Sequence, residues 1–128
     1  MARILVIEDD DIFRMVLSRM LERLGHQVSS AANGNLGLRA MSQTAAELVI
    51  TDLVMPEREG IETIRELRKN YPGTKIIAMS GGSSSEIVRQ NLQCAALLGA
   101  SKILAKPFGI DELTAALRTV FEKVPTID

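Results

Sequence analysis

The sequence predicts an α/β fold in which a parallel five-stranded sheet is covered by helices on both faces, a doubly wound arrangement. Apolar segments of strand length alternate five times with segments whose apolar residues recur at helical spacing. The connections between these segments are short, which favours strand–helix–strand units. The predicted strands are nearly continuous apolar runs, as is typical of strands that are buried on both faces.

Five segments are short, apolar and rich in β-branched residues, and we predict strands there, at 4–7, 27–31, 48–51, 75–79 and 101–105. Helical periodicity predicts helices between and after them, at about 13–24, 36–43, 61–67, 85–98 and 113–121. Gly25 and Gly99 stand where a helix C-terminus is expected. Asp11 and Asp111 are predicted to cap the first and last helices.

Composition excludes several classes of protein. Fifteen basic and sixteen acidic residues leave a net charge of -1, so no direct nucleic-acid partner is expected. No apolar stretch approaches the roughly 20 residues that a membrane span needs, and the N-terminus lacks the layout of a signal peptide. Cys94 is the single cysteine, which rules out an intrachain disulfide and favours a cytoplasmic location.

Polar and charged residues gather where the predicted strands end. Glu8 and Asp9 follow the first strand, Asp52 the third, Ser80 the fourth and Lys106 the fifth. Ligands of open parallel sheets bind at this edge, so these side chains are expected to converge. Carboxylates that meet there repel each other unless a cation lies between them, and Mg²⁺ suits oxygen ligands.

The same residues have the chemistry needed to form an aspartyl phosphate. Asp52 is central and precedes a loop, so it is the best candidate for a carboxylate nucleophile. Glu8 and Asp9 would hold the metal. Ser80 would donate a hydrogen bond to a phosphoryl oxygen, and Lys106 would pair with its charge.

Four motifs, in this order along the chain, resemble a two-component response-regulator receiver domain of the stand-alone, chemotaxis-regulator-like kind. They are ILVIEDD at 4–10, TDLVMP at 51–56 with Gly60, AMSG at 78–81 and KPF at 106–108. Each motif alone is weak evidence for the family. Together, in this order and each at the end of a predicted strand, they are strongly specific. The resemblance implies a flavodoxin-like (βα)5 fold with strand order 2-1-3-4-5. It also implies a receiver domain over 1–124 and a C-terminal tail over 125–128.

The resemblance assigns a role to each site residue. It implies that Asp52 is the phosphoacceptor and that Asp9 and Asp52 bind Mg²⁺ directly, with Glu8 acting mainly through water. The backbone carbonyl of Val54 would complete the protein ligands. Ser80 matches the switch hydroxyl, and Lys106 matches the lysine that contacts the phosphoryl group. The peptide bond before Pro107 is expected to be cis, as is typical of the family.

Two features depart from the family pattern. Receivers usually carry Tyr or Phe three residues before the lysine, whereas this chain has Ile103, so the aromatic half of the usual switch is missing. The segment from Ser80 to Gly99 is about one helical turn longer than in typical members. That segment includes a face that many receivers use for partners.

The leading hypothesis is a phosphorylatable switch rather than a turnover enzyme, because the domain would catalyse only its own phosphorylation and dephosphorylation. A sensor histidine kinase or phosphotransfer protein would supply the phosphoryl group. The modified domain would then present a downstream protein target with the face formed by the helix at 85–98, the strand at 101–105 and the last helix. We expect a monomer or a weak phosphorylation-dependent dimer without membrane contact.

Three other functions compete with this hypothesis. A binding-only pseudo-receiver is favoured only by Ile103, since the acids and the lysine are retained. A Mg²⁺-dependent aspartyl phosphatase of the haloacid-dehalogenase type needs a second acid two residues after its nucleophile, where this chain has Val54. A flavodoxin-like FMN binder needs aromatic residues to stack on the ring, and only 3% of this chain is aromatic.

Overall fold

A computed structural model describes residues 1–53, 59–81 and 99–122 of the chain. The elements, in chain order, are β1 (Arg3–Ile7), α1 (Asp11–Arg23), β2 (Gln27–Ala31), α2 (Gly34–Gln43), β3 (Leu48–Asp52), α3 (Glu59–Asn70), β4 (Lys75–Ser80), β5 (Lys102–Ala105) and α5 (Ile110–Phe121). All four strand pairings are parallel, and the order in the five-stranded sheet is β2-β1-β3-β4-β5. The predicted fold class and strand order are confirmed.

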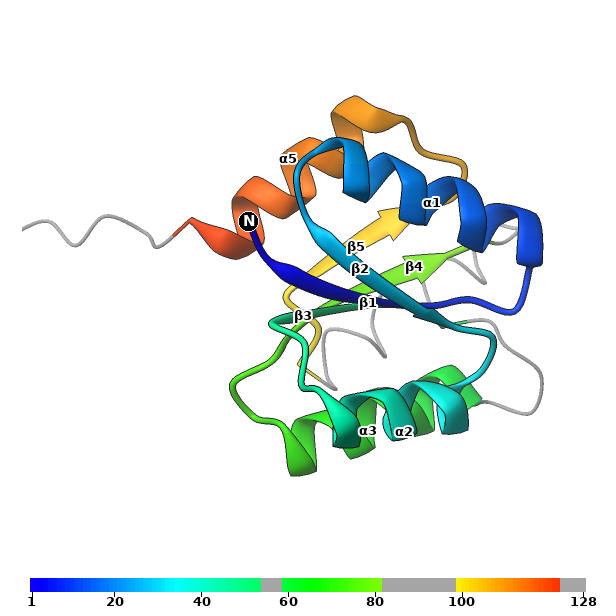
Figure 1. Cartoon of the computed structure of the whole chain (residues 1–128), viewed down its shortest axis with the longest axis vertical. Helices are drawn as coiled ribbons and strands as arrows, with labels where there is room; N and C mark the ends of the chain where they lie inside the picture. The colour runs from blue at the N-terminus through cyan, green and yellow to red at the C-terminus, as the bar shows by residue number, and fades with distance from the viewer. Residues whose placement is uncertain (54–58, 82–98, 123–128) are drawn as a thin grey trace, which may run out of the picture.

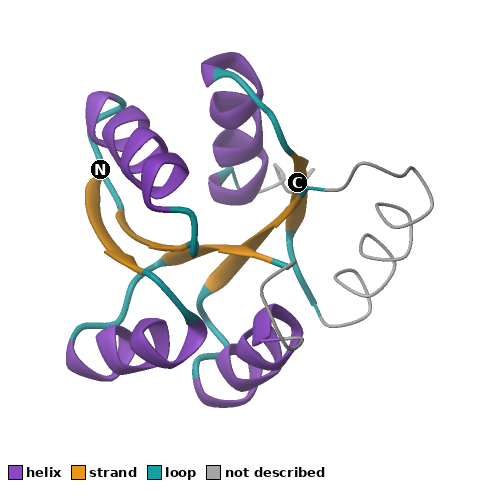
Figure 2. Cartoon of the chain, turned by 90° about the vertical axis from the view of Figure 1, so that its right-hand side faces the viewer, coloured by secondary structure: helices purple, strands orange, loops and turns teal. Residues whose placement is uncertain are grey.

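The sheet lies between two layers of helices (Figure 1). Helices α1 and α5 cover one face, and α2 and α3 cover the other. Figure 2 shows the same three layers with the sheet seen from its side. Because all four strand pairings are parallel, all five strands end at the same edge of the sheet.

The core consists of two apolar clusters, one on each face of the sheet, and β1 contributes to both. Ile4 and Val6 pack beneath α1 and α5, whereas Leu5 and Ile7 pack beneath α2 and α3. All four side chains are buried. Successive side chains of a strand point to opposite faces, so a strand covered on both sides must be apolar at every position.

Two of the predicted helix caps are wrong. Asp10, not Asp11, caps α1: its backbone is extended and its carboxylate accepts a hydrogen bond from the Phe13 amide at 2.9 Å. Asp11 is the first helical residue and pairs with Arg14 at 2.7 Å. In a run of four acidic residues, sequence alone does not show which residue becomes the N-cap of the helix.

The last helix also begins earlier than predicted. Gly109 is its N-cap, with extended backbone and no side-chain capping bond, and Asp111 lies inside the first turn. There its negative charge interacts favourably with the positive end of the helix dipole, and it does not cap a free amide. Gly25 and Gly99, by contrast, both have φ of +95°, the left-handed conformation expected just after a helix.

Several predictions fall outside the described residues. These are the helix at 85–98, the position of Val54 and the boundary between the domain and the 125–128 tail. Among the helices that are described, none combines the length and the apolar character that a membrane crossing requires.

Candidate functional site

The site lies at the edge of the sheet where the strands end. Asp52 is the last residue of β3 and is paired in register with Met79 of β4, one residue before Ser80. Ser80 is paired in turn with Ala105, and its carbonyl accepts a hydrogen bond from the Lys106 amide at 2.8 Å. The parallel register therefore brings three residues that are far apart in sequence to neighbouring positions.

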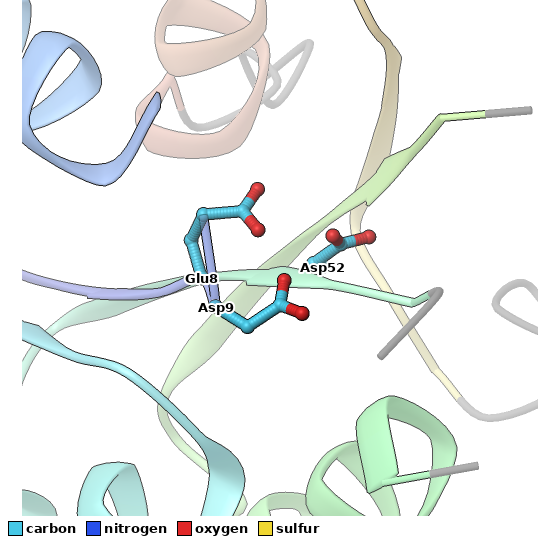
Figure 3. Close-up of side chains that lie close together, drawn as sticks. All are labelled: Glu8, Asp9 and Asp52. Carbon is cyan, nitrogen blue, oxygen red and sulfur yellow. The ribbon is translucent and has the colours of Figure 1, made fainter. Parts of the chain in front are cut away.

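Three carboxyl groups meet at this edge (Figure 3). Glu8 and Asp9 leave the end of β1, and Asp52 leaves the end of β3. One oxygen from each group lies within 4.8 Å of the others. Glu8 and Asp52 are buried, whereas Asp9 is exposed, so the cluster opens to solvent on the side of Asp9.

Lys106 supplies the positive charge that these acids need. Its Nζ donates a hydrogen bond to Oδ2 of Asp52 at 2.9 Å and another to Oε1 of Glu8. The lysine side chain is 18% exposed, and the two carboxylate side chains are 6% and 1% exposed. A buried charge is costly unless it is paired, so this arrangement makes each of the three groups depend on the others.

The pKa values of Glu8 and Lys106 are both shifted by this burial and pairing. Burial raises the pKa of Glu8 to about 7, an effect only partly offset by the hydrogen bond from Lys106. Burial by itself lowers the pKa of Lys106, but its bonds to Glu8 and Asp52 outweigh this effect and leave that pKa raised. Near neutral pH, Glu8 is therefore ready to gain or lose a proton, while Lys106 stays charged.

The backbone around Glu8 is held by neighbouring polar groups. Its carboxylate accepts a hydrogen bond from the Asp10 amide at 3.2 Å, and its carbonyl accepts one from Nη1 of Arg14 at 2.8 Å. These contacts fix the turn from β1 into α1 from which both Glu8 and Asp9 project.

Ser80 adds a hydroxyl to the same edge. The residue is buried, and within the described part of the chain its Oγ has no hydrogen-bond partner. A buried hydroxyl without a partner is destabilising, and such groups are uncommon in native proteins. A hydroxyl at the same sheet edge as a carboxylate and an ammonium suits an oxygen-rich ligand that it can bind as a donor.

The donor set also fits a hard divalent cation. Three clustered carboxylates offer only oxygen ligands, which are those that Mg²⁺ takes, and the cation would relieve their mutual repulsion. The predicted convergence of Glu8, Asp9, Asp52, Ser80 and Lys106 at one edge agrees with this geometry. The predicted carbonyl ligand, Val54, lies outside the described residues.

The remaining predictions near the site can be compared directly. The Lys106–Pro107 peptide bond is cis, as expected. Ile103 is half-buried and packs against the cluster beneath α2 and α3. One residue that sequence reasoning missed is Phe13, whose ring centroid lies 4.6 Å from Nζ of Lys106. Apolar spacing along the first helix predicts only a core position for Phe13.

Comparison with known proteins agrees with the fold. The model of the response regulator receiver domain matches residues 4–118. The chain therefore belongs to the response regulator receiver family of two-component systems.

Individual relatives differ in length. The chain is 38% identical over 124 residues to the probable chemotaxis protein CheY of Rhizobium etli, covering 93% of this chain and 92% of that protein. It is 37% identical over 124 residues to the sensor kinase CckA of Brucella abortus, covering 95% of this chain but only 13% of the kinase. A receiver domain protein from Clostridium thermocellum has a solved structure with 30% identity and a TM-score of 0.84, covering 94% of both chains.

The pKa of Glu8 leads to a prediction about pH. In the metal-free protein, Glu8→Gln is expected to raise the free energy of unfolding at pH 8 by about 1–3 kcal/mol relative to wild type. Folding raises this pKa from 4.5 to about 7, so the folded protein holds the Glu8 proton more tightly than the unfolded chain does. Protonated Glu8 therefore stabilises the folded state. This contribution is fully present below pH 4.5 and is lost as the pH rises through 7. The gain should therefore shrink toward pH 5. Urea unfolding in EDTA at pH 5, 6, 7 and 8 measures it.

The matched control is Glu62→Gln, which removes an exposed carboxylate from α3. Its effect on unfolding should be small and should not follow the same pH dependence. If Glu8→Gln were destabilising by the same amount at every pH, the raised pKa of Glu8 would be contradicted.

Proposed function

We propose that this chain accepts a phosphoryl group on Asp52 from the phosphohistidine of a sensor histidine kinase or phosphotransfer protein, in a Mg²⁺-dependent reaction. One observation carries the proposal. The buried carboxylate of Asp52 lies 2.9 Å from the Lys106 ammonium, at the edge where the Ser80 hydroxyl lies without a hydrogen-bond partner among the described residues. Membership of the receiver family supports the same chemistry.

In the proposed step, a carboxylate oxygen of Asp52 forms a bond to phosphorus as the phosphorus–nitrogen bond of the donor breaks. The electron pair of that bond leaves with the imidazole, which takes up a proton. Lys106 would shift from its present carboxylate partners toward a phosphoryl oxygen, and Ser80 would donate its hydroxyl proton to another. Both groups stabilise negative charge without themselves forming a covalent bond.

The residues at the site fit Mg²⁺, which would neutralise the charge that builds up between the carboxylates and the phosphoryl oxygens. Asp9 and Asp52 would bind it directly, Glu8 mainly through water, and the backbone carbonyl of Val54 would complete the protein ligands. The exposed position of Asp9 leaves this side of the cluster open to solvent and to a phosphoryl donor.

The aspartyl phosphate would then bias a two-state equilibrium of the face that includes β5 and α5, and this face would bind a downstream protein. We propose a cytoplasmic protein that acts as a monomer or a weak phosphorylation-dependent dimer and catalyses only its own phosphorylation and dephosphorylation. Ile103 leaves this chain without the ring that usually accompanies the switch. The signal would therefore have to be carried by other residues.

Acetyl phosphate and beryllofluoride test the proposal. The wild-type protein with Mg²⁺ is expected to gain one phosphoryl group by intact mass and to show amide NMR shifts around residues 52, 80 and 106. Asp52→Asn should show neither, although it is nearly isosteric, because an amide is not a nucleophile for this reaction. The same samples without Mg²⁺ serve as a second control.

Other results would point to the competing functions. A wild-type protein that shows neither modification nor shifts would support a binding-only pseudo-receiver. Steady turnover of phosphate esters would instead support an aspartyl phosphatase.

A further inference from the structure

Among the described residues, the ammonium of Lys106 interacts with two carboxylates and one aromatic ring. Besides Glu8 and Asp52, the Nζ lies 4.6 Å from the centroid of the Phe13 ring and above its face. At this distance a cation is attracted by the negative face of the ring. The interaction is stronger where water is excluded, and this lysine side chain is only 18% exposed.

The Phe13 ring is itself held in place. It packs edge-to-face against Phe108, with centroids 5.7 Å apart and an interplanar angle of 83°. Its backbone amide donates to the Asp10 carboxylate that caps α1. Phe108 follows Lys106 by two residues, so the ring contacts both the lysine and the segment that leaves the lysine toward α5. Both aromatic residues are half-buried against the core beneath α1 and α5.

We propose that Phe13 is a positioning residue for Lys106: its ring holds the ammonium beside Asp52 while leaving it free to move to a phosphoryl oxygen. This inference rests on the proposed function. A third carboxylate in place of the ring would compete with the phosphoryl group for the lysine. A ring attracts the ammonium without a net charge, and it covers one side of the ammonium that water would otherwise occupy.

Three variants test the role of the ring. Phe13→Leu retains apolar bulk but removes the aromatic face, whereas Phe13→Tyr retains the face. Phe121→Leu is the matched control, because Phe121 is also half-buried against the same core but stacks on His26, at the opposite end of α5 from Lys106. Each variant is compared with wild type for its melting temperature, its Mg²⁺ dissociation constant by amide NMR, and its phosphorylation rate with acetyl phosphate at saturating Mg²⁺.

Phe13→Leu is expected to lower the phosphorylation rate by about 3- to 30-fold, the range that corresponds to measured cation–π strengths. Its Mg²⁺ dissociation constant should change less than about twofold, because the ring contacts the lysine and not the acids. Phe13→Tyr should restore a rate near that of wild type, and Phe121→Leu should leave both quantities unchanged. If Phe13 had only a structural role, Phe13→Leu would instead lower the melting temperature, and the phosphorylation rate and the Mg²⁺ affinity would fall together.

A second measurement needs no variant. Protons on the methylene next to Nζ of Lys106 should resonate upfield of their usual position in wild type, because the Nζ to which that methylene is bonded lies above the Phe13 ring. Unshifted protons would overturn the proposal even if Phe13→Leu failed to fold. A wild-type rate in folded Phe13→Leu would overturn it while leaving the proposed function intact. A wild-type protein that cannot be phosphorylated would overturn both.

Discussion

Replacing Lys106 with Met is expected to lower the free energy of unfolding of the metal-free protein by about 3–5 kcal/mol at pH 8. Lys106 is the cation that contacts both buried carboxylates, Glu8 and Asp52. Met keeps the length and apolar stem of the side chain but removes the charge. The loss would be a large fraction of the stability of a domain of this size.

The cost should depend on pH with a definite sign. Without the ammonium, which lowers the pKa of Glu8, that pKa rises further above about 7. A carboxyl group whose pKa is raised by folding favours the folded state only while it is protonated. The difference between Lys106→Met and wild type should therefore be smaller near pH 5, where Glu8 is protonated, and increase as the pH rises through 7.

Magnesium should compensate for part of this loss, since a divalent cation can replace the missing charge between the acids. We expect Lys106→Met to bind Mg²⁺ but to lose the phosphorylation-linked amide shifts seen in wild type. Lys102→Met is the matched control, because Lys102 is an exposed lysine at the start of β5. Equal destabilisation by the two variants, or wild-type shifts in Lys106→Met, would contradict the role assigned to Lys106.

The second large effect is expected from Gly60→Ala, in the first turn of α3. A Cβ at this position would lie 2.7 Å from the carbonyl oxygen of Leu53 and 2.8 Å from its Cα, and closer still to the carbonyl oxygen of Asp52. All three atoms belong to the backbone, so no side chain can rotate away. We expect a loss of about 3 kcal/mol or more in the free energy of unfolding, at or above the upper end for overpacking.

The clash also affects the site, because α3 and the end of β3 must move apart and Asp52 moves with them. The phosphorylation rate of any folded fraction is therefore expected to fall as well. Gly73→Ala is the control: its Cβ would meet nothing within 4 Å, so its stability should stay near that of wild type or rise by a few tenths of a kcal/mol. Urea unfolding of both variants makes the comparison. A tolerated Gly60→Ala would contradict the close approach of α3 to β3.

Much of this architecture could be predicted because it depends on local chemistry. Apolar, β-branched runs specify strands, and the alternation of strands with amphipathic segments specifies a parallel sheet with helices on both faces. The predicted strand at 27–31 matches β2 residue for residue, and each of the other four predicted strands differs from the observed one by one residue at one end. The helix caps were less predictable, because Asp10 and Asp11 have similar chemistry and Gly109 caps without any side chain.

The convergence of the site could also be predicted, since parallel strands end at one edge whatever their sequence separation. The candidate residues Glu8, Asp9, Asp52, Ser80 and Lys106 were identified on that ground. Their electrostatic state could not be predicted in the same way. The shifted pKa of Glu8 depends on how completely the side chain is buried and on which oxygen faces Lys106, and no local pattern encodes either quantity.

The sequence by itself determined the layers, the strand order through its family motifs, and the set of polar residues at the strand ends. Only the tertiary structure decided which of them touch: that Lys106 bridges Glu8 and Asp52, that the Ser80 hydroxyl has no partner among the described residues, and that Phe13 covers the ammonium. The physical reason is that hydrophobic periodicity is a property of neighbouring residues. The strength of an ion pair or a cation–π contact depends instead on distances of a few ångströms between residues far apart in the chain, and on the water excluded between them.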